Sequence, residues 1–311
     1  MRPPKNSERR KVFLVTGAGG FLGACLVRFL VRRYPQHLIV ATARKKKSGV
    51  RAIQGVRWVS GDLRDTAVWK KIPNTITHVF HLAARIPYAA EDRNDSSVLE
   101  DNLAPVIHLI KQTGRWKGLE QIIYSSSISV YGTSPKWKLE GAMLRPAGHY
   151  GSAKRIGEEL LQSLIPKGIQ VACLRLSSMY GPGQYAGTVL PMMLRDARTK
   201  GRVRVFGKGL RSQDFLHVED AVLGLVTALE RRAGGVFNFG CGRPVSMLEL
   251  AGTIRRVFNG GVKVEQIHAE KESDPGNKII IRQAQKELGF VPQVSLEEGL
   301  RRLICESRGV W

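Results

Sequence analysis

The sequence predicts an α/β protein built on a doubly wound parallel sheet, followed by a smaller C-terminal lobe. Short apolar segments alternate with amphipathic stretches from residue 11 to residue 176, and this alternation is typical of βαβ units. Right-handed crossovers between parallel strands make a doubly wound sheet the expected arrangement. After Leu176 the alternation becomes irregular, and glycine and proline gather in YGPGQYAG. We therefore expect a sheet domain over residues 1–176 and a smaller lobe over residues 177–311 that is partly interleaved with the main sheet.

Each element of the sheet domain follows from a local pattern. Residues 11–17, KVFLVTG, predict a buried strand that runs into a glycine turn, and residues 21–33 carry apolar side chains at helical spacing. Five more apolar segments predict strands, and two more amphipathic segments predict helices. These strands are residues 37–42, 55–62, 78–84, 121–127 and 169–176, and these helices are residues 96–114 and 150–165.

The composition argues against several classes of protein. No apolar run is long enough to span a bilayer, and the segment after the basic N-terminus is too short and glycine-broken for a secretory signal. The four cysteines lie far apart without a C-x-x-C pair, which favours reduced thiols and argues against a zinc site. His78 and His81 are interpreted as structural residues. We expect a cytoplasmic protein without a metal ion.

The chain is strongly basic. Lysine and arginine number 49 against 26 aspartate and glutamate, which gives a formal net charge of +23. Such an excess favours partners that carry phosphate, whether nucleotides, nucleic acid or acidic lipid. Because the basic residues are spread over the whole length, the charge indicates association and does not identify a reaction.

A glycine-rich turn, TGAGGFLG, lies between the first predicted strand and the first predicted helix. Gly17, Gly20 and Gly23 would let the backbone turn tightly and approach a pyrophosphate, which the free N–H groups of a helix N-terminus attract. The spacing is G-x-x-G-x-x-G, whereas the common dinucleotide pattern is G-x-G-x-x-G. A structural turn is the alternative, and the strand–turn–helix context favours nucleotide binding.

The end of the second predicted strand bears on the choice between NAD and NADP. NAD-binding proteins usually carry an acidic residue near this point, whereas an arginine suits the 2′-phosphate of NADP. Here Thr42 is uncharged, and Arg44 is followed by lysines at positions 45–47. The basic run favours NADP over NAD, with a solvated basic loop as the alternative. After the third strand, GDLRD places Asp62 and Leu63 where an adenine could be held.

A series of short stretches extends these observations over nearly the whole chain. In order they are TGAGGFLG, GDLRD, HLAA, Asn102 in the following helix, SSSISVYG, YGSAK, LRLSSMYGPGQ, VRVFGKGLRSQDFLHVEDA, VFNFGCGRPVSMLEL and KELGFVPQVSLEEGLR. Any one of them could arise by chance, whereas the ordered set is specific. From about Val12 to the C-terminal helix, the set resembles the extended short-chain dehydrogenase/reductases, in particular their nucleotide-sugar epimerase/dehydratase branch.

The resemblance implies a Rossmann fold, an NAD(P)-dependent enzyme and a set of site residues. Tyr150 and Lys154 lie one helical turn apart, where the lysine charge favours the phenolate of a tyrosine whose free pKa is about 10. By resemblance, Tyr150 exchanges a proton with a sugar hydroxyl, Lys154 also holds the nicotinamide ribose, and Ser127 hydrogen-bonds the reacting oxygen. The implied cofactor-binding residues are Gly17, Gly20, Phe21, Leu22, Gly23, Arg44, Asp62, Leu63, Leu82, Ala83, Ala84, Asn102, Tyr150 and Lys154.

The residues after Ser127 discriminate among the reactions of this family. In its 4,6-dehydratases an aspartate and a glutamate follow directly and act as acid and base, whereas here Ile128 and Ser129 follow. The cysteine that the GDP-fucose-forming members keep near this hydroxyl is also missing, since Cys173 lies on another strand. Dehydration and that fucose branch are therefore disfavoured. Hydride transfer at one carbon, C4, is the expected chemistry.

The candidate substrate-binding residues are Ser126, Ser178 and Arg211, and two positions depart from the family pattern. Gln213 stands where an arginine often binds the substrate's phosphates, so that Arg211 is the nearest substitute. Ser178 stands in place of an asparagine that often meets the phosphate of the nucleotide sugar. Ser126 has a structural alternative as a polar residue at a strand end, and Arg175 is interpreted as a structural strand residue.

Three functions remain, of which an NAD(P)-dependent nucleotide-sugar 4-epimerase is the leading one. An NADPH-dependent 4-keto-sugar reductase, or another carbonyl reductase, is the alternative that the basic run favours. A basic nucleic-acid-binding protein that kept only the fold is motivated by the net charge, but no basic surface with interleaved aromatic residues supports it. A homodimer is also expected, because residues 97–114 and 150–165 correspond to the helices of the family's four-helix interface.

Overall fold

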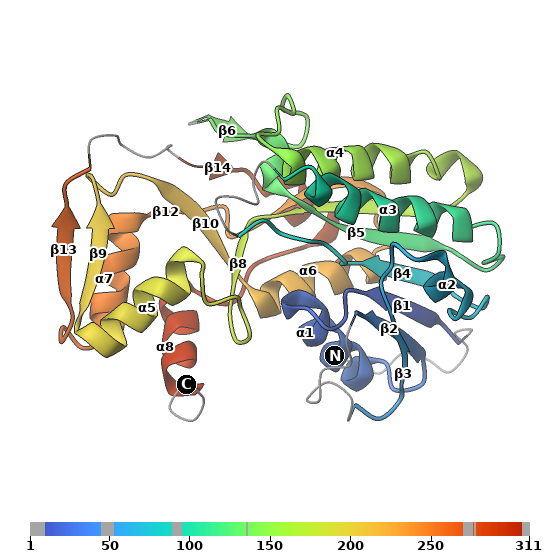
Figure 1. Cartoon of the computed structure of the whole chain (residues 1–311), viewed down its shortest axis with the longest axis horizontal. Helices are drawn as coiled ribbons and strands as arrows, with labels where there is room; N and C mark the ends of the chain where they lie inside the picture. The colour runs from blue at the N-terminus through green and yellow to red at the C-terminus, as the bar shows by residue number, and fades with distance from the viewer. Residues whose placement is uncertain are drawn as a thin grey trace.

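A seven-stranded parallel sheet forms the centre of the larger half of the protein (Figure 1). The computed structural model describes residues 10–44, 53–88, 95–134, 136–269, 276 and 278–306. The strand order is β11-β7-β5-β4-β1-β2-β3, and every neighbouring pair is parallel, so that the predicted fold class is confirmed. The strands are β1 (Val12–Thr16), β2 (Leu38–Ala43), β3 (Val56–Ser60), β4 (His78–His81), β5 (Gln121–Ser127), β7 (Gln170–Leu176) and β11 (Gly235–Phe239).

The direction in which the strands are added reverses beside β1. From β1 the chain adds β2 and β3 on one side, and then adds β4, β5, β7 and β11 on the other side. The loops after the two strands that flank such a reversal leave a crevice between them, where ligands bind in open α/β sheets. Here those loops are the glycine-rich turn after β1 and the loop after β4, which begins at Leu82.

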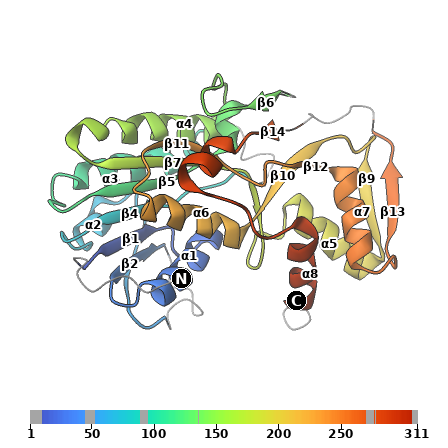
Figure 2. The ribbon, with the colours of Figure 1, turned by 180° about the vertical axis from the view of Figure 1, so that it is seen from behind.

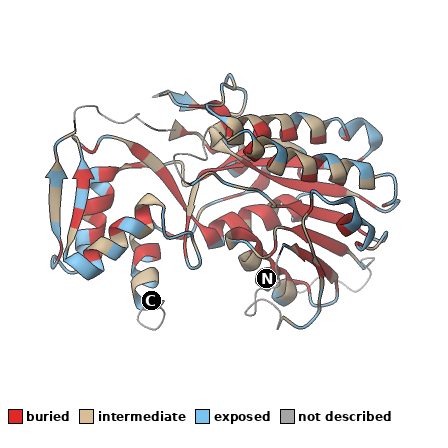
Figure 3. Ribbon diagram, in the orientation of Figure 1, coloured by how far each residue is buried: buried red, intermediate tan, exposed pale blue. Residues whose placement is uncertain are grey.

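Helices cover both faces of the sheet (Figures 1 and 2). Phe13 and Val15 of β1 belong to a core shared with α1 and α6, whereas Val12 and Leu14 belong to a core shared with α2, α3 and α4. Figure 3 shows the strands buried along most of their length, because both faces are covered. The helices are α1 (Phe21–Arg33), α2 (Thr66–Lys70), α3 (Ser97–Gln112), α4 (His149–Gln162) and α6 (Val218–Glu230).

The smaller lobe lies beside one end of the large sheet and has a core of its own (Figure 1). Val205, Leu250 and Leu300 are among the residues of this core. Between segments of this lobe the chain returns to the large sheet through α6 and β11, while the predicted boundary at residue 176 stays a prediction. The remaining elements are β6 (Trp137–Lys138), β8 (Ser178–Tyr180), α5 (Val189–Lys200), β9 (Arg202–Phe206), β10 (Ser212–His217), β12 (Pro244–Ser246), α7 (Met247–Val257), β13 (Lys263–Ile267), β14 (Lys278–Ile279) and α8 (Leu296–Glu306), with short helical turns η2 (Ile128–Tyr131), η3 (Ile165–Lys167) and η4 (Ala284–Leu288).

The observed elements differ from the predicted ones mainly at their ends. β4 stops at His81 and not at residue 84, because the N–H groups of Leu82 and Ala83 bind the side chain of Thr16 and not a neighbouring strand. α2 was not predicted from its short pattern, and Asp65 begins it by accepting a hydrogen bond from the backbone N–H of Ala67.

A buried ion pair joins α4 to the sheet. Nη2 of Arg175 lies 2.7 Å from Oε2 of Glu158, and the two side chains are 4% and 2% exposed. Arg175 also donates to the hydroxyl of Tyr131, which donates in turn to Asn238 of β11. The hydroxyl of Ser126 donates to Glu158. Such a pair is tolerated in a core only when hydrogen bonds satisfy both charges, so Arg175 has the structural role that was predicted for it.

Other general features can be stated for the part of the chain that the structure describes. No helix there is long and apolar enough to cross a membrane. The same residues contain no group of three or more histidine, cysteine, aspartate or glutamate side chains arranged to hold a metal ion. The four cysteines are free thiols.

Candidate active site

A cavity of about 1870 Å³ lies between the larger half of the protein and the smaller lobe. The glycine-rich turn, the loops after β2, β3 and β4, the end of β5 and the start of α4 line it from one side. Parts of α5, β9 and β10 line it from the other side. Small-molecule sites usually measure about 300–1,000 Å³. This cavity therefore has room for a dinucleotide and a second ligand beside it.

The glycine-rich turn leaves no space for a side chain at Gly17 or Gly23. Gly17 has a φ of 68°, and a Cβ added to it would lie 2.8 Å from the backbone of Ala83. A Cβ on Gly23 would lie 2.3 Å from the carbonyl oxygen of Gly17. A tight turn of this kind at the start of a helix fits the pyrophosphate of a dinucleotide. The predicted residues that line the cavity here are Gly17, Gly20, Phe21, Leu22 and Gly23.

Thr16, the last residue of β1, fixes the loop after β4. Its Oγ1 accepts hydrogen bonds from the N–H groups of Leu82 at 3.1 Å and Ala83 at 3.2 Å. It also lies 2.9 Å from Nδ1 of His81, an imidazole whose pKa is lowered by burial to about 3 and which is therefore neutral. As a result Leu82, Ala83 and Ala84 line the cavity beside the glycine-rich turn, as the predicted cofactor contacts require.

The loops after β2 and β3 line the part of the cavity predicted to receive the adenosine end of the cofactor. Thr42 is buried, whereas Arg44 is exposed, and both line the cavity. The lysines at positions 45–47 lie outside the described residues, so only Arg44 of the basic run is placed. Asp62 and Leu63 line the same region.

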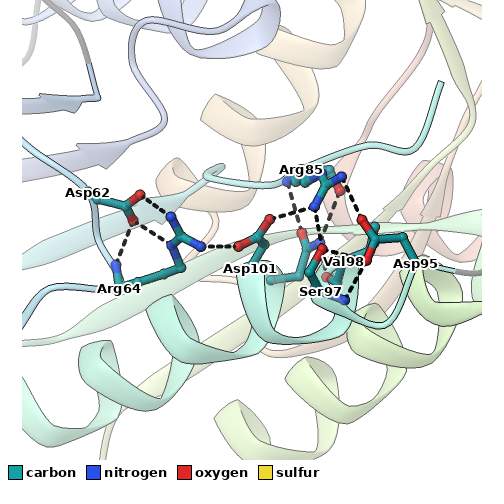
Figure 4. Close-up of polar contacts among 8 residues, drawn as sticks. Asp62, Arg64, Arg85, Asp95, Ser97, Val98 and Asp101 are labelled. Atoms are coloured by element: carbon teal, nitrogen blue, oxygen red, sulfur yellow. Dashed lines mark hydrogen bonds and ion pairs between the residues drawn. The ribbon is translucent and has the colours of Figure 1, made fainter. Parts of the chain in front are cut away.

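A row of alternating acids and arginines follows this wall of the cavity (Figure 4). Arg64 donates to both carboxylate oxygens of Asp62, from Nε at 3.1 Å and from Nη2 at 2.8 Å, and from Nη1 to Asp101 at 2.6 Å. Arg85 donates to the other oxygen of Asp101 at 3.0 Å and to Asp95 at 2.9 Å. Hydrogen bonding to Arg64 lowers the pKa of Asp62 and keeps it ionised. The row joins the loop after β3 to the loop after β4 through the start of α3.

Asn102 of α3 contacts this loop and is not among the residues that line the cavity. Its Oδ1 accepts from the N–H of Arg85 at 3.1 Å, and its Nδ2 donates to the carbonyl of Arg85 at 3.0 Å and to that of Val98 at 2.7 Å. The side chain therefore fixes the shape of the loop after β4. A direct contact of Asn102 with the cofactor stays a prediction.

Ser127, Tyr150 and Lys154 come together on one wall of the cavity. Ser127 is the last residue of β5, and the other two lie one turn apart in α4, which packs against β5. Nζ of Lys154 donates to the backbone carbonyl of Ser125 at 2.6 Å and lies 5.8 Å from the centre of the Tyr150 ring. The three predicted catalytic residues thus share one site, and their roles in catalysis stay predictions.

Small residues allow α4 to lie close to β5 and to the turn η2 that follows it. A Cβ on Gly151 would lie 2.7 Å from the carbonyl oxygen of Ser129. A Cβ on Gly157 would lie 2.5 Å from the phenol oxygen of Tyr124. Larger residues at these two positions would move Tyr150 away from Ser127.

Burial disfavours the charged forms of both Tyr150 and Lys154. It raises the pKa of Tyr150, the nearby Tyr88 raises it further, and the Ser127 hydroxyl lowers it. Burial lowers the pKa of Lys154 to about 7, and the charge of Glu158 opposes this effect. The Ser127 hydroxyl is therefore the group that favours a phenolate at Tyr150.

The predicted substrate-binding residues also line the cavity. Ser178 and Arg211 do so from the smaller lobe, together with Gln213. Ser126 lines it from β5, although its hydroxyl donates to Glu158. Their contacts with a substrate stay predictions.

Residues 13–240 match the family described as the NAD dependent epimerase/dehydratase family. The chain belongs to this family. UDP-glucuronate 4-epimerase 2 from Arabidopsis thaliana is 28% identical over 94% of this chain and 74% of that protein. A dTDP-glucose 4,6-dehydratase from Streptomyces griseus is 30% identical over 94% of this chain and 92% of that protein. The predicted resemblance to the extended short-chain dehydrogenase/reductases is confirmed.

Solved structures agree with this membership. MoeE5 in complex with UDP-glucuronic acid and NAD has a TM-score of 0.81 and 28% identity, with 96% of this chain and 99% of that chain covered. A UDP-glucose 4-epimerase from Thermotoga maritima has a TM-score of 0.84 at 24% identity, with 96% and 99% covered, and supports the fold. The protein is therefore an enzyme of the epimerase/dehydratase family.

Some cavity residues of this family member were overlooked in the sequence. Tyr88 lines the cavity and stacks on Tyr185 with ring centres 4.4 Å apart, and the two tyrosines come from loops of the two halves of the protein. Neither tyrosine belongs to a pattern that could have indicated this contact. Arg85 also lines the cavity, and its position directly after HLAA could have indicated this in the sequence.

Replacement of Lys154 by methionine should make the cofactor-free protein more stable in a pH-dependent way. The folded lysine has a pKa of about 7 and the unfolded one a pKa near 10.5, so burying its charge lowers stability fully below pH 7. This loss shrinks as the pH rises from 7 toward 10.5, because the folded protein has then released the proton and its removal from the unfolded chain costs less at higher pH. Urea unfolding at about pH 6 and about pH 9 should show the larger gain for Lys154→Met at the lower pH.

The exposed Lys117 provides a control, because Lys117→Met removes a charge that is already in water. A gain for Lys154→Met that is equal at both pH values would mean that packing, and not the buried charge, changed the stability.

Proposed function

We propose that the protein is a nucleotide-sugar 4-epimerase that uses Tyr150 as the proton-transferring residue. The observation that carries this proposal is the convergence of Ser127, Tyr150 and Lys154 on one cavity that also contains the glycine-rich turn and faces the smaller lobe. The relatives named UDP-glucuronate 4-epimerase support it. The residues of the turn fit a dinucleotide, because Gly17 and Gly23 allow a tight turn at the start of α1, where a pyrophosphate binds in folds of this kind.

The side chains divide the reaction among them. Tyr150 takes the proton of the C4 hydroxyl and later returns it, while Ser127 hydrogen-bonds the same oxygen. Lys154 favours the phenolate through its charge and is held by the carbonyl of Ser125. Bound NAD(P) supplies the acceptor and donor of the C4 hydride. The size of the cavity allows the 4-keto sugar to turn over between the two transfers.

Elimination of water is disfavoured by the residues that follow Ser127. Ile128 and Ser129 line the cavity where a 4,6-dehydratase of this family needs an acid and a base. Neither the hydrocarbon side chain of isoleucine nor the hydroxyl of serine exchanges protons at carbon efficiently near neutral pH. A change confined to C4 is therefore the reaction that this set of side chains supports best.

Tyr150→Phe should reduce turnover by about 10²- to 10⁴-fold, because phenylalanine keeps the ring and loses the proton. A panel of nucleotide sugars, beginning with UDP-glucuronic acid, should be tested with deuterium at C4. An epimerase returns the label to C4 of the product, and NMR spectroscopy of the product checks this.

Tyr185→Phe serves as the matched control, since it removes a hydroxyl but keeps the ring that stacks on Tyr88. Its turnover should stay close to that of the wild type. Full activity of Tyr150→Phe would contradict the proposed role, and loss of the label from C4 would contradict epimerisation.

We also propose that the enzyme prefers NADP(H) to NAD(H). Thr42 and Arg44 line the cavity where NAD-specific proteins of this fold usually place a carboxylate. Arg44 is exposed and available for the 2′-phosphate of NADP. The same observation favours an NADPH-dependent 4-keto-sugar reductase as the second candidate function, because an epimerase regains its cofactor in each cycle and does not need the NADPH pool.

Arg44→Ala should weaken NADP(H) binding about ten-fold and leave NAD(H) binding nearly unchanged, since only NADP(H) carries the 2′-phosphate. Calorimetry with both cofactors at two salt concentrations measures this, and Arg57→Ala on β3 is a control for the loss of one exposed positive charge. Equal losses of affinity for both cofactors would show that Arg44 acts only through the overall electrostatic field of the protein. A wild-type preference for NAD(H) would make the NADP proposal wrong and would favour the epimerase over the reductase.

We further propose that the enzyme is a cytoplasmic homodimer formed through α3 and α4. Ile107 on α3 is 42% exposed although it is a large apolar residue, and α3 packs beside α4. The four free thiols are consistent with a reducing compartment.

Light scattering should give the mass of two chains for the wild type and of one chain for Ile107→Glu, because a carboxylate would be buried at the interface. Leu248→Glu is a matched control, since Leu248 is also 42% exposed but lies on α7 of the smaller lobe. A single-chain mass for the wild type at micromolar concentration would contradict the dimer.

A further inference from the structure

The hydroxyl of Ser127 is held by Ser129, a residue for which the mechanism above gives no positive role. The backbone N–H of Ser129 donates to Oγ of Ser127 at 3.2 Å, and the hydroxyl of Ser129 donates to the same oxygen at 2.9 Å. A hydroxyl has two acceptor positions and one proton. Both acceptor positions of Ser127 are therefore filled from within its own turn, and its proton is what remains for another partner.

The turn that carries Ser129 is fixed on both sides. Val130 and Tyr131 are buried, and the Tyr131 hydroxyl donates to Asn238. The carbonyl oxygen of Ser129 lies 2.7 Å from the place that a Cβ on Gly151 would take, so that Ser129 packs against the residue directly after Tyr150. Ser129 is thus tied to the end of β5 and to the start of α4 at once.

We propose that Ser129 is a positioning residue for the reaction, because it commits Ser127 to donate its hydrogen bond toward the oxygen of Tyr150 or of the substrate. The inference rests on the proposed function, in which these two oxygens exchange a proton. Ser129, Ser127 and Tyr150 all line the cavity, so the arrangement lies where the exchange takes place.

The direction of this hydrogen bond decides which protonation state of Tyr150 is favoured. If Ser127 could accept, the phenol of Tyr150 would donate to it, and that bond stabilises the neutral tyrosine. When Ser127 can only donate, it stabilises the phenolate, and equally an alkoxide at C4 of the sugar. One such hydrogen bond corresponds to an effect of about three- to ten-fold on the rate.

The kinetic test compares Ser129→Ala with Ser129→Thr. Ser129→Ala should lower kcat about three- to ten-fold with little change in KM, and should move the acidic limb of the pH profile to higher pH. Ser129→Thr keeps the hydroxyl and should restore both values. The control is Ser152→Ala in the first turn of α4, since the Ser152 hydroxyl donates to the carbonyl of Gly148 and does not touch Ser127. Failure of threonine to restore the profile would overturn the proposal.

A second measurement does not depend on any sugar substrate. NMR spectra of protein with ¹³C-labelled tyrosine, saturated with NAD, follow the ionisation of Tyr150, which the Tyr150→Phe protein identifies. The ionisable groups that act on Tyr150 or lie against its ring are Tyr88, Tyr124 and Lys154, and all of them are unchanged in Ser129→Ala.

Tyr150 should ionise at a higher pH in the Ser129→Ala protein than in the wild type. Ionisation at the same pH in both proteins would overturn the proposal for Ser129, whatever the enzyme's reaction is. If the wild type turns over no nucleotide sugar but the shift is found, the proposed function is wrong and the hydrogen-bond assignment stands.

Discussion

The close contact between α4 and β5 is the constraint on which the site depends. Lys154 and Glu158, one turn apart on α4, bind the backbone of Ser125 and the hydroxyl of Ser126, two successive residues of β5. These contacts form only because Gly151 and Gly157 let the helix approach the strand and its following turn. The sequence YGSAKRIGEE therefore combines the proposed catalytic residues with structural ones in one short helix. A change that widened this contact would move Tyr150 and Lys154 away from Ser127.

The same contact places several ionisable groups in a poorly solvated region. Lys154 is 1% exposed, and Glu158 and Arg175 are nearly as deeply buried. The ion pair of Glu158 and Arg175 satisfies its own charges, whereas Lys154 is held by a neutral carbonyl and loses part of its affinity for a proton. Buried charge of this kind lowers stability and is typical of sites that need perturbed pKa values.

Much of the large sheet could be predicted because its signals are local. A strand buried on both faces is apolar throughout, and the spacing of Tyr150 and Lys154 is itself a helical turn. The bounds of β5 and α1 agree with the predicted residues 121–127 and 21–33. The glycine-rich turn could also be predicted from a local pattern, because a tight turn requires glycine at these positions.

What escaped prediction depends on which distant segments meet. β4 ends early because Thr16, on another strand, takes the N–H groups that would have continued it. The row from Asp62 to Asp95 joins two loops and a helix, and no period in the sequence indicates that contact. Asn102 was singled out by resemblance, and only the structure shows that it holds the backbone of Arg85.

The position of β11 has a consequence for the order in which the chain can assemble. This strand completes the large sheet beside β7, and Gln121 of β5 donates to the carbonyls of Ala228 and Ala233 in the segment that leads to it. While the chain is being synthesised, the first six strands emerge from the ribosome long before their last neighbour. Until then β7 is an open edge, with unpaired backbone groups that can attach to other chains. The large sheet is thus complete only after part of the smaller lobe has been made.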